Sequence, residues 1–257
     1  MMKIAVFQAD TKDKRISENL KRYRSFIDRL DEDTDLLIMP ETFTKGFTIE
    51  EFFAEDMNGE GLGFMKQVAA ERNMAVEGSL LIKEDGRYKN RHFFVTPDSV
   101  SYYDKRHLFC LSREPEVISR GENPVTVQYK GWKIKLQTCY DLRFPLWSRN
   151  RLGDKGEYDY DLLVYVASWT DVRISHWEKL LPARAIENQS YLVGVNRCGV
   201  DETGLNYKGA SVVLDYNGNV LAAARDNTEE IVYAVIDKDK LDKYRKKFPV
   251  AKDWDSI

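Results

Sequence analysis

The chain has 257 residues, 43% of them hydrophobic, which is enough for a large core, and we predict a single domain over residues 1–257. Its 39 basic and 42 acidic residues nearly balance, so charge gives no reason to expect nucleic acid or an anionic membrane surface as a partner. The start of the chain has the pattern of a strand rather than a signal peptide, and no apolar stretch approaches the roughly 20 residues of a membrane-spanning helix. Three widely spaced cysteines argue for a reducing compartment. We therefore expect a cytoplasmic protein.

The first half of the chain has the hydrophobic pattern of an α/β protein. The pattern predicts strands at about 3–8, 35–39, 74–82, 88–96 and 99–103, and helices at about 17–30 and 62–73. Asp85-Gly86 predicts a hairpin between the third and fourth strands. Residues 111–123 have no hydrophobic period, which indicates a long loop, and such loops in compact domains are often functional.

The second half continues the alternation of strands and helices. It predicts strands at about 125–129, 132–138, 160–167, 191–195, 210–214 and 231–236, with helices after residue 139, at 174–189 and at 238–247. Asn217-Gly218 indicates another hairpin. This mixture of helices, strands and hairpins predicts two sheets covered by helices.

The strand at 132–138 ends at Cys139, which would stand at a turn into a helix that Asp141 can cap. A thiol at such a turn meets the positive end of the helix dipole and unpaired N–H groups. These groups would favour the thiolate and could hold an oxyanion. Since a lone cysteine among apolar residues is more often structural, this stretch alone does not decide between the two interpretations.

Three reactive side chains follow the carboxyl ends of predicted strands: Glu41, Lys105 and Cys139. In open α/β sheets that edge is where sites form. A cysteine that hydrolyses an amide needs a base for its proton, a positive donor for the oxyanion and a proton for the leaving ammonia. These three residue types supply all of them, although each residue taken singly also fits a solvated or structural role.

Three sequence blocks resemble the signature blocks of the nitrilase (carbon-nitrogen hydrolase) superfamily. They are Leu36-Leu-Ile-Met-Pro-Glu41-Thr-Phe, Tyr103-Asp-Lys105-Arg-His107-Leu-Phe and Cys139-Tyr-Asp-Leu-Arg143-Phe-Pro145. The resemblance covers nearly the whole chain, because Ala183-Arg-Ala-Ile-Glu-Asn188 and the order of strands and helices also fit. It implies a four-layer α-β-β-α sandwich and, commonly, a homodimer.

The resemblance also implies roles for individual residues. Cys139 would be the nucleophile, Glu41 the general base and Lys105 the residue that stabilises the tetrahedral intermediate, which the Tyr140 backbone N–H would also face. A further family glutamate lies in the loop after the lysine. Glu114 is the best match for it, and Glu116 is a weaker candidate.

The residues around these blocks, with the later His176-Trp-Glu, resemble the bacterial omega-amidases. That branch hydrolyses the terminal amide of 2-oxoglutaramate and 2-oxosuccinamate to a 2-oxo dicarboxylate and ammonia. Another small amide, such as an N-carbamoyl amino acid or deaminated glutathione, remains an alternative substrate. So does a catalytically silent scaffold in which Cys139 is unreactive.

A substrate with a distant carboxylate needs a cationic partner, for which Arg143 and Arg173 are candidates. A surface ion pair is an equally good interpretation of either arginine. Phe43 and Phe47 could form a wall of the pocket, although aromatic residues at this density are more often in the core.

We expect no metal and no cofactor. Only three histidines occur, His92, His107 and His176, without ligand spacing, and there is no Gly-rich phosphate loop. His107 is expected instead to support the lysine loop by hydrogen bonding.

Overall fold

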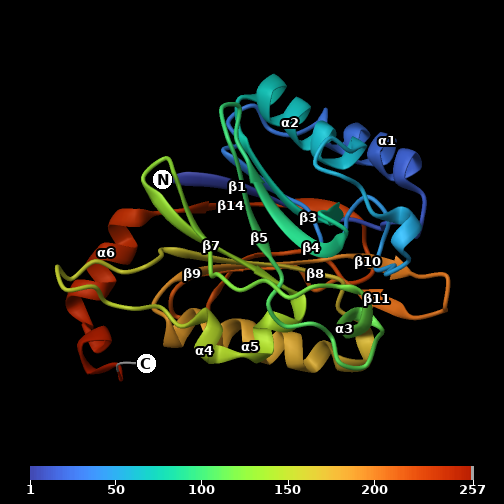
Figure 1. Cartoon of the computed structure of the whole chain (residues 1–257). Coiled ribbons are helices and arrows are strands. Elements are labelled where there is room, and N and C mark those ends of the chain that lie inside the picture. The colour runs from blue at the N-terminus through green and yellow to red at the C-terminus, as the bar shows by residue number, and fades with distance from the viewer. Residues whose placement is uncertain (256–257) are drawn as a thin grey trace.

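The computed structural model describes residues 1–255 and arranges them in four layers, with helices on the outside and two sheets between them (Figure 1). This is the α-β-β-α sandwich that the resemblance implies. The last two residues of the predicted domain, 256–257, lie outside the described part of the chain. Among the described helices, none combines the length and the apolar character that crossing a membrane requires.

The first sheet has six strands in the order β14-β1-β2-β3-β4-β5. In chain order they are β1 (Met2–Gln8), β2 (Leu36–Ile38), β3 (Ala75–Glu84), β4 (Arg87–Val95), β5 (Val100–Asp104) and β14 (Glu230–Ile236). Strands β1, β2 and β3 are parallel, because the crossover helices α1 (Ile16–Ile27) and α2 (Glu60–Arg72) connect them. The predicted Asp85-Gly86 hairpin is confirmed, with Glu84 paired to Arg87.

The second sheet also has six strands, in the order β13-β12-β9-β8-β7-β6. They are β6 (Thr126–Tyr129), β7 (Trp132–Thr138), β8 (Leu162–Ala167), β9 (Tyr191–Asn196), β12 (Val212–Leu214) and β13 (Val220–Ala223). The central strands β7, β8 and β9 are parallel, and helix α5 (Ile174–Glu187) covers their outer face (Figure 1). Helix α6 (Lys238–Lys247) and the 3-10 helix η4 (Val250–Asp253) end the described chain.

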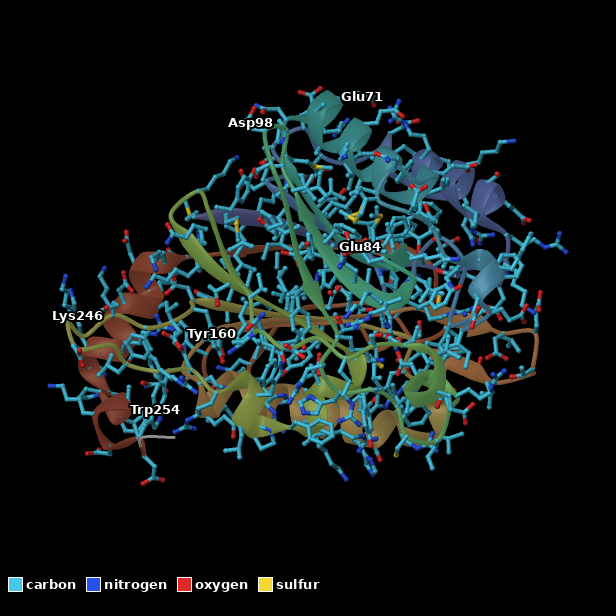
Figure 2. The ribbon with its side chains drawn as sticks, in the orientation of Figure 1. Glu71, Glu84, Asp98, Tyr160, Lys246 and Trp254 are labelled. Atoms are coloured by element: carbon cyan, nitrogen blue, oxygen red, sulfur yellow. The ribbon has the colours of Figure 1, made fainter. Side chains whose placement is uncertain are left out.

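Alternating side chains explain how the layers hold together. Ile38 and Ile134 belong to the apolar core between the two sheets, whereas Leu37 faces the core under α1 and α2. On the other side, Leu163 packs in the core beneath α5. Figure 2 shows that side chains fill the spaces between the layers, while Glu71 and Lys246 lie at the periphery.

The structure differs from the sequence predictions mainly in its shortest elements. Residues 111–123, predicted as a loop, contain the one-turn helix α3 (Glu114–Val117). In place of one helix predicted after residue 139, the structure has a five-residue 3-10 helix that includes this residue, η2 (Cys139–Arg143), followed by α4 (Pro145–Ser148). Pro145 explains this division, because it lacks the N–H needed to continue the first turn.

Other short elements carry too few residues for a recognisable period. They are the small antiparallel ribbon of β10 (Cys198–Val200) and β11 (Asn206–Lys208), strand β13, and the 3-10 helices η1 (Glu51–Phe53) and η3 (Asp171–Arg173).

Candidate active site

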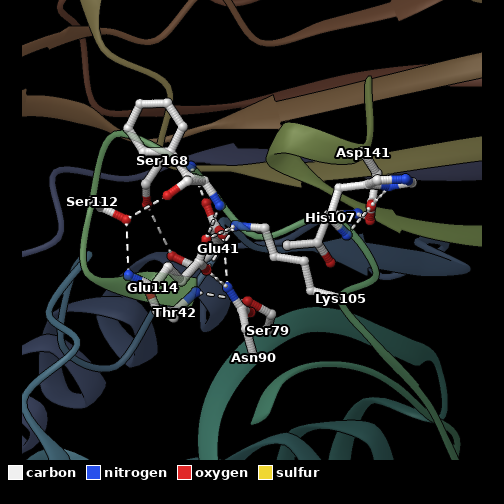
Figure 3. A network of polar contacts seen from close by, with 12 residues as sticks. Glu41, Thr42, Ser79, Asn90, Lys105, His107, Ser112, Glu114, Asp141 and Ser168 are labelled. Atoms are coloured by element: carbon white, nitrogen blue, oxygen red, sulfur yellow. Dashed lines mark hydrogen bonds and ion pairs between the residues drawn. The ribbon is translucent and has the colours of Figure 1, made fainter. Parts of the chain in front are cut away.

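Four strands end around one buried point between the two sheets. Glu41 follows β2, Lys105 follows β5, Cys139 follows β7 and Ser168 follows β8. Figure 3 shows the side chains of Glu41 and Lys105 directed toward one another, with Glu114 beside them. The sandwich therefore brings together residues that are up to 127 positions apart in the sequence.

Both oxygens of the buried Glu41 carboxylate have defined partners. Oε1 accepts hydrogen bonds from Lys105 Nζ at 2.9 Å and from Asn90 Nδ2 at 2.8 Å. Oε2 accepts one from the Ser168 backbone N–H at 2.8 Å. These three donors fix the direction of the carboxylate.

Lys105 lies between two buried carboxylates. Its Nζ donates to Glu41 and also to both oxygens of Glu114, at 2.8 Å and 3.0 Å. Burial alone would lower the pKa of Lys105, but Glu114 and Glu41 outweigh it and hold the pKa well above its usual value. The weaker candidate Glu116 is exposed and pairs with Arg113 at 3.1 Å, so it does not reach this cluster.

Cys139 is buried at the turn from β7 into η2. Burial raises the pKa of its thiol well above the usual value, and Glu41 raises it further, while Lys105 lowers it in part. The turn was expected to favour the thiolate, but the net pKa of the thiol is raised and not lowered, with burial as the largest cause. A five-residue 3-10 helix supplies only a short dipole, and burial favours the neutral thiol over the charged thiolate.

The backbone is strained at two positions of the site. Cys139 has φ +46°, and Thr42, next to Glu41, has φ +45°. Positive φ is rare for residues other than glycine, above all for a β-branched residue. The Thr42 backbone N–H donates to Ser79 Oγ at 2.8 Å, which helps to hold this conformation and with it the direction of the Glu41 side chain.

A cavity of about 330 Å³ opens over Cys139 and Lys105. The predicted residues Phe47, Tyr140, Arg143 and Arg173 line it. Tyr140 stands at the start of η2, where backbone N–H groups have no intrahelical acceptor.

Phe43 does not form a wall of the cavity. It is fully buried in the core under α1 and α2, with its ring centroid 5.4 Å from that of Tyr23. The aromatic residue that does line the cavity is Phe47, four positions later.

The two arginines of the cavity are not ion-paired with any carboxylate among residues 1–255. The Arg143 guanidinium lies 4.6 Å from the Trp169 ring centroid and contacts His176 Nδ1 at 3.0 Å. The Arg173 guanidinium lies 5.4 Å from the Phe109 ring centroid. The surface ion pair that was an alternative for these arginines is therefore not formed, and both cations face the cavity.

Several residues of the site were not predicted from the sequence. Asn90 is in the middle of β4, where nothing in the sequence distinguishes it from other polar strand residues. Ser168 could have been predicted as a site residue, because it follows the carboxyl end of a predicted strand. Tyr207, on the short strand β11, lines the cavity from an element that the pattern did not reveal.

The chain is similar to known carbon-nitrogen hydrolases over most of its length. The Carbon-nitrogen hydrolase family model matches residues 3–246. "Omega-amidase YafV" of Escherichia coli (strain K12) is 39% identical over 224 residues, which are 87% of this chain and 85% of the relative. "2-oxoglutaramate amidase" of Bacillus subtilis (strain 168) is 30% identical over 97% of this chain and 96% of the relative.

A solved structure agrees with these relatives. The crystal structure of a CN-hydrolase superfamily protein from Xanthomonas campestris, which has an arsenic adduct in its active site, is 38% identical. The similarity covers 100% of this chain and 98% of that one, with a TM-score of 0.96. Together with the family model, this agreement identifies the chain as a member of the carbon-nitrogen hydrolase family.

Proposed function

We propose that this protein is an omega-amidase that hydrolyses the terminal amide of 2-oxoglutaramate, and of the shorter 2-oxosuccinamate, to the 2-oxo dicarboxylate and ammonia. The observation that carries the proposal is the cavity, in which Cys139, beside Glu41 and Lys105, shares one space with two arginines. The names of relatives at 30–39% identity support the same activity.

The first half of the reaction forms a thioester. Glu41 accepts the proton of the Cys139 thiol, and the sulfur attacks the carboxamide carbon. The oxyanion that develops faces Lys105 Nζ and the Tyr140 backbone N–H. Protonated Glu41 then gives its proton to the leaving nitrogen, the C–N bond breaks, and ammonia departs.

The second half returns the enzyme to its resting state. A water molecule gives a proton to Glu41 as its oxygen attacks the thioester carbon. The carbon–sulfur bond then breaks, the acid is released, and the proton returns to Cys139. One amide and one water thus become one carboxylic acid and one ammonia.

Glu114 keeps the lysine charged during this cycle. When Glu41 is protonated, Lys105 loses one of its two carboxylate neighbours. Glu114, whose two oxygens accept from Nζ at 2.8 Å and 3.0 Å, continues to stabilise the ammonium. The positive charge is then present when the oxyanion forms.

The two arginines of the cavity favour a substrate that carries a negative charge. Arg143 and Arg173 line the same cavity as the nucleophile, and neither is paired with a carboxylate among residues 1–255. A guanidinium binds a carboxylate through two parallel hydrogen bonds and can also donate to a 2-oxo group. A neutral amide would leave both cations without a counter-charge.

Ammonia release tests the proposal, with 2-oxoglutaramate compared with glutamine, an N-carbamoyl amino acid and deaminated glutathione. We expect turnover of the 2-oxo amide that Cys139→Ala abolishes and that Cys198→Ala retains, because Cys198 is a buried cysteine outside the cavity. If the enzyme cleaved only one of the other amides, that amide would replace 2-oxoglutaramate as the proposed substrate. A folded protein that releases ammonia from none of them would favour the silent scaffold.

The same proposal includes a cytoplasmic homodimer. Cys110, Cys139 and Cys198 are all free thiols in the structure, which suits a reducing compartment. Light scattering on the eluting peak of a size-exclusion column tests the dimer, because it measures the mass of the particle directly.

A further inference from the structure

Asp141 is a buried carboxylate that accepts four hydrogen bonds. Its Oδ1 accepts from the backbone N–H of His107 at 2.9 Å and contacts His107 Nδ1 at 2.8 Å. Its Oδ2 accepts from Tyr103 Oη at 2.7 Å and from the Thr138 backbone N–H at 3.1 Å. The catalytic scheme above uses none of these groups.

The four donors come from the two segments that carry the reacting groups. Lys105 lies between Tyr103 and His107, which both donate to Asp141. Cys139 lies between Thr138, which also donates, and Asp141 itself. One carboxylate therefore ties the exit of β5 to the turn after β7.

Further contacts stiffen the β5 side of this connection. Tyr103 Oη accepts from the Arg106 backbone N–H at 3.0 Å and from Trp147 Nε1 at 2.9 Å. The His107 ring stacks on Phe144 with a centroid distance of 3.7 Å. The expected support of the lysine loop by His107 is thus seen, and its acceptor is Asp141.

This carboxylate and imidazole do not form a Cys-His-Asp triad. His107 is not among the residues that line the cavity, whereas Lys105 and Cys139 are. Figure 3 shows His107 and Asp141 on the side of Lys105 that is away from Glu41 and Glu114. The pair therefore acts at a distance from the reacting atoms.

We propose that Asp141 is a positioning residue that holds Lys105 at its working distance from Cys139. This inference rests on the proposed roles of Lys105 and Cys139. An oxyanion donor acts only where the charge develops, and displacement by about 1 Å can cost about 100-fold in rate. A link between two separate strand ends is the means by which the fold sets that distance.

The proposal predicts that Asp141→Asn slows the alkylation of Cys139. A direct effect of the lost charge on the thiol would instead make alkylation faster. Lys105 lowers the pKa of Cys139, whereas the carboxylate of Glu41 raises it, as a negative charge near a thiol does in general. Removing the charge of Asp141 would, by electrostatics alone, favour the thiolate. Displacing Lys105 would disfavour it, so slower alkylation of Cys139 marks the loss of position.

The test measures alkylation of Cys139 by iodoacetamide in Asp141→Asn, with Lys105 present and in a Lys105→Met background. Peptide mass spectrometry separates Cys139 from the exposed Cys110, because tryptic cleavage places them on different peptides. We expect at least about fivefold slower alkylation with Lys105 present, and less than about twofold in Lys105→Met, since the thiolate fraction changes tenfold per unit of pKa.

Arg184→Gln is the matched control. Arg184 holds the same turn from α5, with Nε and Nη2 donating to the Leu142 carbonyl at 3.1 Å and 2.9 Å, but it does not touch the lysine segment. Arg184→Gln should change the alkylation rate of Cys139 by the same factor whether Lys105 is present or replaced by Met. In Asp141→Asn, kcat for 2-oxoglutaramate should also fall while KM changes little.

Equal slowing by Asp141→Asn in both backgrounds, or faster alkylation, would overturn the proposal. If Asp141→Asn does not fold, Tyr103→Phe takes its place under the same criteria, because it removes one donor and keeps the carboxylate. Alkylation needs no substrate. The result therefore stands even if 2-oxoglutaramate proves to be the wrong amide.

Discussion

Glu114 accepts two hydrogen bonds from Lys105 Nζ, at 2.8 Å and 3.0 Å, and both side chains are buried. A buried lysine would ordinarily lose its proton, because burial disfavours the charged form. With Glu114 on one side and Glu41 on the other, the pKa of Lys105 instead stays well above its usual value. The fold thus favours a charged Lys105 beside Cys139, the proposed nucleophile.

Glu114→Gln should lower kcat/KM for 2-oxoglutaramate by about 100- to 1,000-fold, the usual cost of losing one oxyanion donor. The reason is that burial then lowers the pKa of Lys105 with only Glu41 to oppose it. Steady-state ammonia release measures the effect. Glu116→Gln, two residues away on an exposed side chain, is the control and should stay within about twofold of wild type. Equal effects of the two substitutions would contradict the role of Glu114.

Glu41→Gln should separate the reactivity of the thiol from turnover. Hydrolysis should fall by at least about 10,000-fold, because the base and the proton donor are lost together. Glu41 raises the pKa of Cys139 and Lys105 lowers it, so the variant should have a lower thiol pKa. Iodoacetamide at pH 8 should then alkylate Cys139 at least as fast as in wild type. Slower alkylation would show that removal of the thiol proton by Glu41 as a base outweighs its electrostatic effect on the pKa of Cys139.

Arg143→Met and Arg173→Met should each raise KM for 2-oxoglutaramate by about 10- to 100-fold, since a hydrogen bond to a charged group contributes about 1.5–3 kcal/mol. An uncharged amide of similar length should be turned over only weakly, and the two substitutions should change its rate by less than about threefold. Arg113→Met is the control, because that arginine is exposed and lies outside the cavity. If the substitutions weakened both substrates equally, the arginines would be structural and would not bind the carboxylate.

The buried Lys45 should make the free energy of unfolding depend on pH. Its side chain is fully buried, Nζ donates to the Thr48 carbonyl at 2.7 Å, and burial lowers its pKa to about 7. In the unfolded chain the pKa is about 10.4, so between these values the unfolded state binds more protons and stability rises with pH. Below about pH 7 the folded state carries the full cost of the buried charge, at most about 5 kcal/mol.

The measurement for Lys45 is urea unfolding at about pH 6 and about pH 9.5. Lys45→Met should be the more stable protein at the lower pH, and its advantage over wild type should shrink at the higher pH. Lys66→Met, at an exposed position of α2, should show no such change between the two values. A constant difference between wild type and Lys45→Met would mean that folding does not lower the pKa of Lys45, which would then stay charged at both pH values.

The sequence predicted the parts of this protein that depend on long patterns. Buried runs such as 160–167 and hairpin dipeptides such as Asp85-Gly86 determine strands locally, and the two-sheet arrangement follows from them. The catalytic candidates Glu41, Lys105 and Cys139 were found because each follows a predicted strand and lies in a family block. Glu114 was found only through the resemblance.

The remaining features depend on contacts that no local pattern carries. Asn90 reaches Glu41 across 49 residues of sequence, and the Ser168 backbone N–H reaches it across 127. Phe43 and Phe47 both fit a pocket wall by composition, and only the direction of the chain after β2 separates the core residue from the cavity residue. The raised pKa of Cys139 was not predicted, because burial cannot be judged from the turn alone.

The central claim is that Cys139 is acylated by 2-oxoglutaramate. The most direct test mixes enzyme and substrate, quenches the reaction in acid within milliseconds and measures the mass of the Cys139 peptide. We predict a transient mass increase equal to one 2-oxoglutaryl group, formed together with ammonia and absent in Cys139→Ala. Ammonia release from 2-oxoglutaramate in Cys139→Ala, or a quenched wild-type enzyme that never carries the acyl group on this cysteine during turnover, would contradict it.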